Sequence, residues 1–130
     1  MYPTKTKILT KKIKHKKETI ELMKKISLTI NSKNKKQKIN SMLKELEKIY
    51  NTKTNIKISK KNKHDCYNPK TNTIYLKDPP SIITALHEFS HHLYGSSEIQ
   101  ACRWSTQLFI KTFPNLYKKL KWKGHLLIKK

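Results

Sequence analysis

Apolar residues recur at helical spacing in two stretches of the first half of the chain. Between residues 36 and 50 they form one continuous stripe, made of Ile39, Met42, Leu43, Leu46, Ile49 and Tyr50. Residues 18–30 carry a sparser stripe of the same kind, at Ile20, Met23, Ile26 and Ile30. Because positions three and four apart share one face of an α-helix, both stretches are predicted to be helices that bury that face.

Helical spacing returns in the second half of the chain. The run 82–94 is apolar on most of its circumference, which predicts a buried helix with Asp78 as its N-cap and Gly95 as its C-cap. A second helix is predicted over residues 98–113, and a short amphipathic helix over 116–122.

Short β-type runs lie between and after these helices. Residues 54–59 alternate isoleucine with polar residues, and residues 74–76 form a second short apolar run, so two strands are predicted, the second at a sheet edge. Residues 124–130 contain a further apolar run, which predicts an added strand or a packing tail.

This order of elements predicts one α+β domain over residues 17–130, with helices packed on a short, largely antiparallel sheet. Residues 1–16 are rich in lysine and poor in apolar positions. They are predicted to be a basic tail, and their composition permits disorder.

The buried helix carries the pattern H-E-x-x-H at His87, Glu88 and His91. Positions i and i+4 lie on one face of a helix, so the two imidazoles can bind one Zn²⁺ (zinc) ion. Glu88 lies about 100° around the helix, beside the metal, where a carboxylate can take a proton from a metal-bound water. The motif therefore predicts a catalytic zinc site with Glu88 as its general base.

A catalytic zinc site needs a third protein ligand and leaves one position for water. Gly95 to Ser97 break the helix, Ser97 can cap a new one, and Glu98 opens it, which makes Glu98 the first candidate. His125 is the rival third ligand, because its distance along the chain permits it. His92 points about 100° away from His91 and is not expected to bind the metal.

The pattern H-E-x-x-H, a short turn, then E-x-x-A followed by an aromatic residue, resembles the ImmA/IrrE-like metallopeptidases and related gluzincins. The resemblance implies a zincin-like fold in which Glu98 completes the zinc site, Ala101 is the alanine of the second motif and Trp104 its aromatic residue. Cys102 stands where the family usually has Asp or Asn.

The resemblance covers residues 56–110. Residues 65–77 resemble the turn and strand that precede many zincin helices, which implies that they border the active-site cleft. Tyr67 and Tyr75 are the candidates for stabilising an oxyanion, because this placement puts both near the cleft.

The net charge of +22, from 30 basic and 8 acidic residues, is the most extreme bulk property of the chain. Arg103 is the single arginine, and lysine binds phosphate as a point charge without reading bases through a planar fork. We therefore expect nonspecific, salt-dependent attraction to nucleic acid through the lysine-rich surface. The lysine bias of a low-GC genome predicts the same excess without any function.

Cys66 and Cys102 are too few for a disulfide framework, and no run approaches the roughly 20 apolar residues of a membrane span. Residues 1–17 lack the apolar segment of a signal peptide. These features predict a cytoplasmic (intracellular) protein without a membrane partner.

Together these features predict a zinc metallopeptidase that hydrolyses peptide bonds of an intracellular protein. Two alternatives stay open: a SprT-like protease acting on DNA-associated proteins, and a non-enzymatic nucleic-acid-binding module on a degenerate zincin scaffold. The lysine excess suits the SprT-like alternative, whose third ligand is usually His, whereas Glu98 favours the first interpretation. The intact Glu88 argues against the binding module, because binding alone needs no general base.

Overall fold

The computed structural model describes residues 2–130 and contains six helices and five strands over that range. In chain order they are α1 (Lys5–Thr10), α2 (Lys17–Thr29), α3 (Lys35–Ile49), β1 (Asn55–Ile58), β2 (Cys66–Asn68), β3 (Thr73–Leu76), α4 (Ile82–Tyr94), α5 (Glu98–Thr112), α6 (Pro114–Lys118), β4 (Leu120–Lys123) and β5 (Leu126–Lys129). The predicted α+β class is confirmed. Within the same range, no helix combines the length and the apolarity that crossing a bilayer requires.

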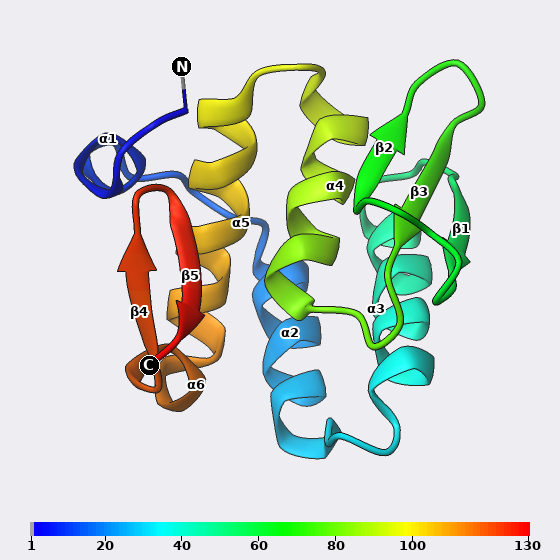
Figure 1. Ribbon diagram of the computed structural model, residues 1–130, viewed down its shortest axis with the longest axis horizontal. Coiled ribbons are helices and arrows are strands. Elements are labelled where there is room, and N and C mark those ends of the chain that lie inside the picture. The colour runs from blue at the N-terminus through cyan, green and yellow to red at the C-terminus, as the bar shows by residue number, and fades with distance from the viewer. Residues whose placement is uncertain (1) are drawn as a thin grey trace.

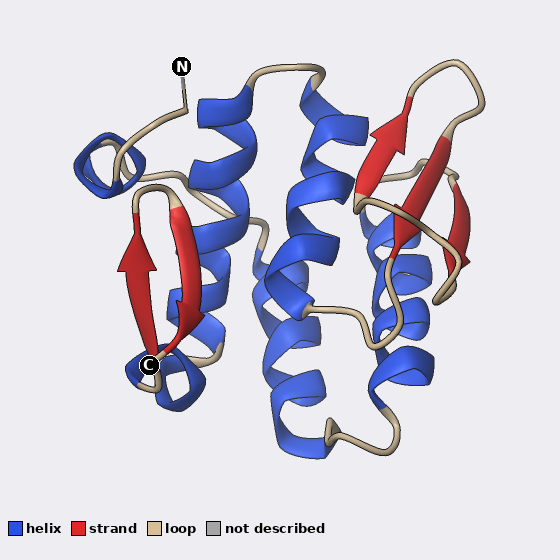
Figure 2. Ribbon diagram, in the orientation of Figure 1, coloured by secondary structure: helices blue, strands red, loops and turns tan. Residues whose placement is uncertain are grey.

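Helix α4 lies at the centre of the molecule (Figure 1). It runs beside α5, contacts α3, and touches strands β2 and β3 along another side. The strands lie on two flanks of this helical body, β1 to β3 beside α4 and the β4–β5 hairpin at the other end (Figure 2). The element with the H-E-x-x-H motif is therefore held between helices and a sheet.

Strand β3 is the central strand of the three-stranded sheet. It pairs parallel with β1, with Ile56 opposite Ile74, and antiparallel with β2, with Tyr67 opposite Ile74. The prediction that residues 74–76 form an edge strand is wrong, because β2 covers the side that was expected to be free. The three residues of β2 show no alternation of polar and apolar positions, so the sequence pattern did not reveal this strand.

The helical stripes predicted from the sequence meet in one core. Phe89 of α4 and Trp104 of α5 are 0% and 2% exposed, and the ring of Tyr50 packs edge-on against both, with centroids 6.1 Å apart. Burying a side chain of this size contributes about 1.5–3 kcal/mol. This packing fixes α4 against α5, and with it the positions of the side chains on the adjoining faces.

Residues 2–16 dock on α5, in contrast to the tail predicted from their composition. Ile8 of α1 is fully buried, and the side-chain amide of Gln107 donates to Ile8 O at 2.9 Å and to Lys11 O at 2.7 Å. The same side chain accepts a hydrogen bond from the Ile13 N–H at 2.8 Å. Ile8, Leu9 and Ile13 stand among lysines and are too few to form a helical stripe, and the partner side chain lies on a helix 94 to 99 residues later.

The C-terminal segment also differs from its prediction. The helix expected over residues 116–122 ends at Lys118, and residues 120–123 form β4, which pairs antiparallel with β5 around Gly124. Leu120 and Trp122 alternate with lysines, a period of two that fits a strand better than a helix. The strand predicted within residues 124–130 is confirmed as β5.

Candidate metal centre

Helix α4 begins after Pro80, with Ser81 as its N-cap: the Ser81 hydroxyl accepts a hydrogen bond from an N–H of the first turn at 3.4 Å. The prediction of Asp78 as the cap is wrong by three positions. Pro80 disfavours helical conformation at the residue before it, so the helix cannot start at Pro79. The Asp78 carboxylate instead lies 3.7 Å from the Lys36 ammonium nitrogen.

A short turn brings the start of α5 back against the end of α4. Gly95 is the predicted C-cap, with φ of 88°, and its N–H donates to His91 O at 2.9 Å. A positive φ of this kind favours glycine because other residues carry a Cβ that clashes there. Ser97 then caps α5 by accepting from the Gln100 N–H at 3.3 Å. The turn therefore places Glu98, the first residue of α5, beside the last turns of α4.

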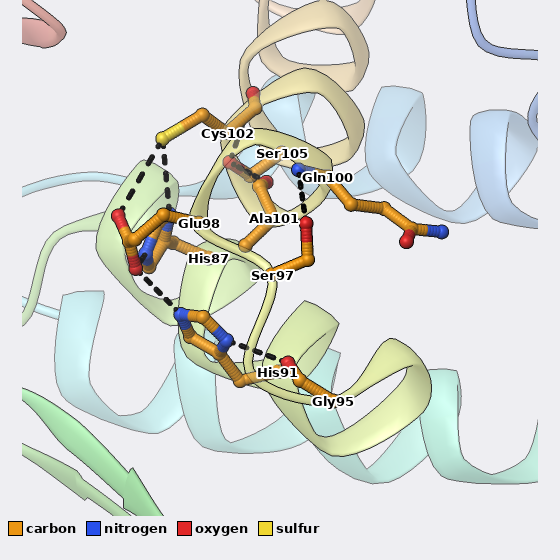
Figure 3. A network of polar contacts seen from close by, with 9 residues as sticks. All are labelled: His87, His91, Gly95, Ser97, Glu98, Gln100, Ala101, Cys102 and Ser105. Atoms are coloured by element: carbon orange, nitrogen blue, oxygen red, sulfur yellow. Dashed lines mark hydrogen bonds and ion pairs between the residues drawn. The ribbon is translucent and has the colours of Figure 1, made fainter. Parts of the chain in front are cut away.

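His87, His91 and Glu98 converge on one point (Figure 3). Nε2 of His87 lies 3.0 Å from Oε1 of Glu98, and Nε2 of His91 lies 2.7 Å from the same oxygen. All three predicted ligands are thus brought together, two from α4 and one from α5. Two imidazole nitrogens and one carboxylate oxygen form a donor set that suits Zn²⁺.

The other nitrogen of each imidazole also has a partner. Nδ1 of His91 lies 2.8 Å from the carbonyl oxygen of Gly95, and Nδ1 of His87 lies 3.8 Å from Sγ of Cys102. A carbonyl accepts only, so it holds a proton on Nδ1 of His91 and leaves Nε2 as the nitrogen that faces Glu98.

The ionisation of the cluster also favours a cation. Burial alone would raise the pKa of Glu98, but the charge of His87 and hydrogen bonds from both histidines outweigh it and lower that pKa. Burial lowers the pKa of His87, and Glu98 only partly offsets this. At neutral pH the cluster therefore contains a carboxylate and a neutral His87 imidazole, which is the metal-binding form of histidine.

Glu88 is 8% exposed, and burial, with smaller contributions from Glu98 and Asp65, raises its pKa to about 7. A group with this pKa can both accept and release a proton near neutral pH. Glu88 donates no atom to the cluster of His87, His91 and Glu98, which agrees with its place about 100° around the helix.

A cleft of about 400 Å³ opens onto this cluster. Its walls come from β2 and the turn around it, from α4, and from the turn before α5, through Asp65, Cys66, Tyr67, Pro69, Glu88, His91, Gly95, Ser96 and Glu98. Three carboxylates face the cleft, and no lysine is among these lining residues. Although the protein has a net charge of +22, the candidate metal position therefore lies among acidic groups.

The two tyrosines predicted as oxyanion stabilisers lie differently from expectation. Tyr67 lines the cleft, but its hydroxyl donates to Asn72 Oδ1 at 2.8 Å and lies 3.0 Å from Nδ1 of His92. His92 in turn lies 2.6 Å from the Thr52 hydroxyl. This network ties β2 to the end of α4 and engages the Tyr67 hydroxyl. Tyr75 is not among the residues that line the cleft.

His125 contributes no atom to the cluster. It lies in the β4–β5 turn, where its ring stacks on Tyr2 with centroids 4.4 Å apart. It is close enough that its charge adds to the lowering of the His87 pKa, after burial. Of the two predicted rivals for the third ligand, Glu98 is the one that the structure brings to the two histidines.

Cys102 belongs to the cluster, although the sequence identifies it only as a departure from the family pattern. Its sulfur and donor atoms of His87 and Glu98 lie within 4.8 Å of one another. The spacing of four residues from Glu98 could have revealed it, because i and i+4 share a helix face. A second signal is compositional: residues 78–110, which span α4 and most of α5, contain no lysine in a chain with 30 basic residues.

Comparisons of this chain with protein-family models, with curated proteins and with solved structures found no match.

Proposed function

We propose that this chain is a zinc-dependent metallopeptidase that hydrolyses peptide bonds of an intracellular protein, in line with the gluzincin-type pattern of its sequence. The observation that carries the proposal is the convergence of His87, His91 and Glu98 within 3.0 Å contacts, with the buried Glu88 carboxyl beside them. A structural zinc site has four protein ligands, whereas a catalytic one has three and an open position. The cleft provides space at that position.

A zinc ion bound by these three residues would lower the pKa of its water to about 7 and polarise a substrate carbonyl. The residues of the chain supply the rest. Glu88 accepts the proton of the attacking water and returns it to the leaving amine, and its raised pKa of about 7 suits both transfers. Such general acid–base catalysis typically contributes about 10²–10⁴-fold to the rate.

Strand β2 is the element best placed to hold a peptide substrate. It is an edge of the three-stranded sheet, paired with β3 on one side, and its residues Cys66 and Tyr67 line the cleft. An extended peptide can add to a free sheet edge through main-chain hydrogen bonds, which do not depend on its sequence. We infer that the substrate lies along β2, with the scissile bond over Glu88.

The lysines do not favour the SprT-like alternative. A groove of about 870 Å³ is lined by Lys33, Lys36, Lys57 and Lys61 and lies along β1. Because β1 and β2 are opposite edges of the sheet, this basic groove is separated from the cleft. A protease acting on DNA-bound proteins is expected to carry its basic face beside the cleft.

The first test is metal content. Protein purified without chelator should contain close to one equivalent of zinc by elemental analysis, and His91→Ala and Glu98→Gln should each lower its zinc retention during dialysis. His125→Ala is the matched control, because this histidine lies outside the cluster, and it should keep its zinc. Well-folded wild-type protein that binds no zinc would overturn the proposal.

The second test separates chemistry from metal binding. Zinc-loaded wild type and Glu88→Gln are compared for cleavage of casein and a panel of other unfolded proteins. Glu88→Gln should retain zinc, because Glu88 is not a ligand, and should lose about 10²–10⁴-fold in rate. If this variant cleaves as fast as wild type, Glu88 is not the general base.

A further inference from the structure

Cys102 is the least expected member of the metal cluster. It lies one turn after Glu98 on α5, is 4% exposed, and its sulfur is 3.8 Å from both His87 Nδ1 and Glu98 Oε2. Figure 3 shows the sulfur on the far side of these two groups from His91. The thiol therefore contacts one histidine of the pair and one oxygen of the carboxylate.

The contacts of the two histidines are closely parallel. Each presents Nε2 to Oε1 of Glu98, and each has its Nδ1 next to another group: the Gly95 carbonyl for His91 and the Cys102 thiol for His87. Groups that bind the second nitrogen of a ligating histidine fix its ring orientation and tautomer. For His91 the backbone does this, and no substitution of a side chain can remove it. For His87 the group next to Nδ1 is a side chain, that of Cys102, which a substitution can remove.

The thiol of Cys102 is suited to a contact with Nδ1 of His87 when a metal takes Nε2. An S–H group is a weak donor and its sulfur a weak acceptor. Its proton is directed to Glu98 Oε2, and its sulfur can accept from Nδ1–H of His87 when Nε2 is given to a metal.

We propose that Cys102 is a positioning residue that holds the His87 imidazole through Nδ1, so that Nε2 faces the metal position. The sulfur acts through His87 and is not itself a metal ligand: its two polar contacts are with Nδ1 of His87 and Oε2 of Glu98, while the two histidines meet Glu98 through Nε2 and Oε1. This inference rests on the zinc binding proposed above.

Three variants test it through zinc affinity, measured by competition with a chromophoric chelator. Cys102→Ala removes the contact, and zinc affinity should fall by about 10-fold or more, the usual effect of losing such a partner. Cys102→Ser keeps a group that donates and accepts and should recover most of the affinity. Cys66→Ala is the control, because Cys66 is exposed and the thiol next to Nδ1 of His87 is that of Cys102, and the zinc affinity of this variant should equal that of wild type. Thermal unfolding of each metal-free variant checks that it is folded.

Cobalt substitution distinguishes positioning from ligation. A thiolate bound to Co²⁺ gives an intense near-ultraviolet charge-transfer band, which should be absent from cobalt-loaded wild type. A band that disappears in Cys102→Ala would overturn the proposal by making Cys102 a ligand. Folded Cys102→Ala with unchanged zinc affinity would overturn it as well while leaving the zinc site intact. A wild type that binds no zinc overturns the proposed function first and the role of Cys102 with it.

Discussion

Glu88→Gln should stabilise the metal-free protein at alkaline pH, although it should slow hydrolysis by about 10²–10⁴-fold. Burial raises the pKa of Glu88 from 4.5 to about 7, which means that the fold disfavours the ionised carboxylate. A pKa difference of one corresponds to about 1.4 kcal/mol, so the ionised group costs the metal-free fold on the order of 3 kcal/mol. Glutamine has nearly the same size and carries no charge, so this cost disappears.

The direction of this pH dependence of stability follows from how many protons the folded and unfolded states bind. The folded pKa lies above the unfolded one, so between pH 4.5 and about 7 the native state holds a proton that the unfolded chain has released. The contribution of Glu88 to stability is therefore lost as pH rises through this window. Wild type and Glu88→Gln should differ little at pH 4.5 and by roughly 3 kcal/mol above pH 7, or on the order of 10 °C in unfolding temperature.

The assay is urea unfolding of chelator-treated protein, monitored by circular dichroism, at several pH values from 4.5 to 8.5. Glu21→Gln is the control, because its side chain is 59% exposed and its removal should change stability by less than about 1 kcal/mol at every pH. A gap between wild type and Glu88→Gln that does not widen with pH would refute the reasoning. The Glu88 carboxylate would then be solvated or paired in the native state.

Three further predictions concern other parts of the molecule. Phe89→Ala, at a fully buried position, should lower the free energy of unfolding by about 3–5 kcal/mol. Leu28→Ala, at a position 85% exposed, should change it by less than about 0.5 kcal/mol. Equal midpoints of urea unfolding for the two variants would contradict the observed core. Burial lowers the pKa of His15 despite its hydrogen bond to Trp104 O, so on acidification the unfolded chain takes up a proton before the folded one. Wild type should therefore lose stability below about pH 6.5. A His15→Asn variant that loses as much stability at acid pH as wild type would show that His15 is not responsible. Nucleic-acid binding, measured by fluorescence anisotropy, should fall steeply with salt. Replacing the groove lysines with glutamine should weaken nucleic-acid binding more than replacing four exposed lysines elsewhere, and equal losses of affinity would point to net charge alone. The groove set is Lys33, Lys36, Lys57 and Lys61, and the control set is Lys24, Lys25, Lys121 and Lys123.

The sequence by itself determined the features of the site that depend on neighbouring residues. The spacing of His87 and His91 puts two imidazoles on one helix face whatever surrounds the helix. Gly95 and Ser97 end one helix and begin the next, and this short connection leaves Glu98 few places other than the last turns of α4. The stripe on α3 likewise predicted which face is buried, because helical periodicity is a local property of the chain.

Only the tertiary structure decided which distant segments meet. A periodic pattern shows which face of an element is buried but does not identify its partner, so the sequence predicts β3 at an edge, whereas β2 pairs with it in the structure. The docking of α1 and the residues after it depends on Gln107, which is 94 to 99 residues away, and no local pattern predicts a contact of that kind. The same holds for His125, whose distance along the chain permitted a ligand role and whose position in the β4–β5 turn keeps it out of the cluster. Cys102 lies between these cases: its spacing from Glu98 is local, but its contact with His87 exists because α4 and α5 pack together through Phe89 and Trp104.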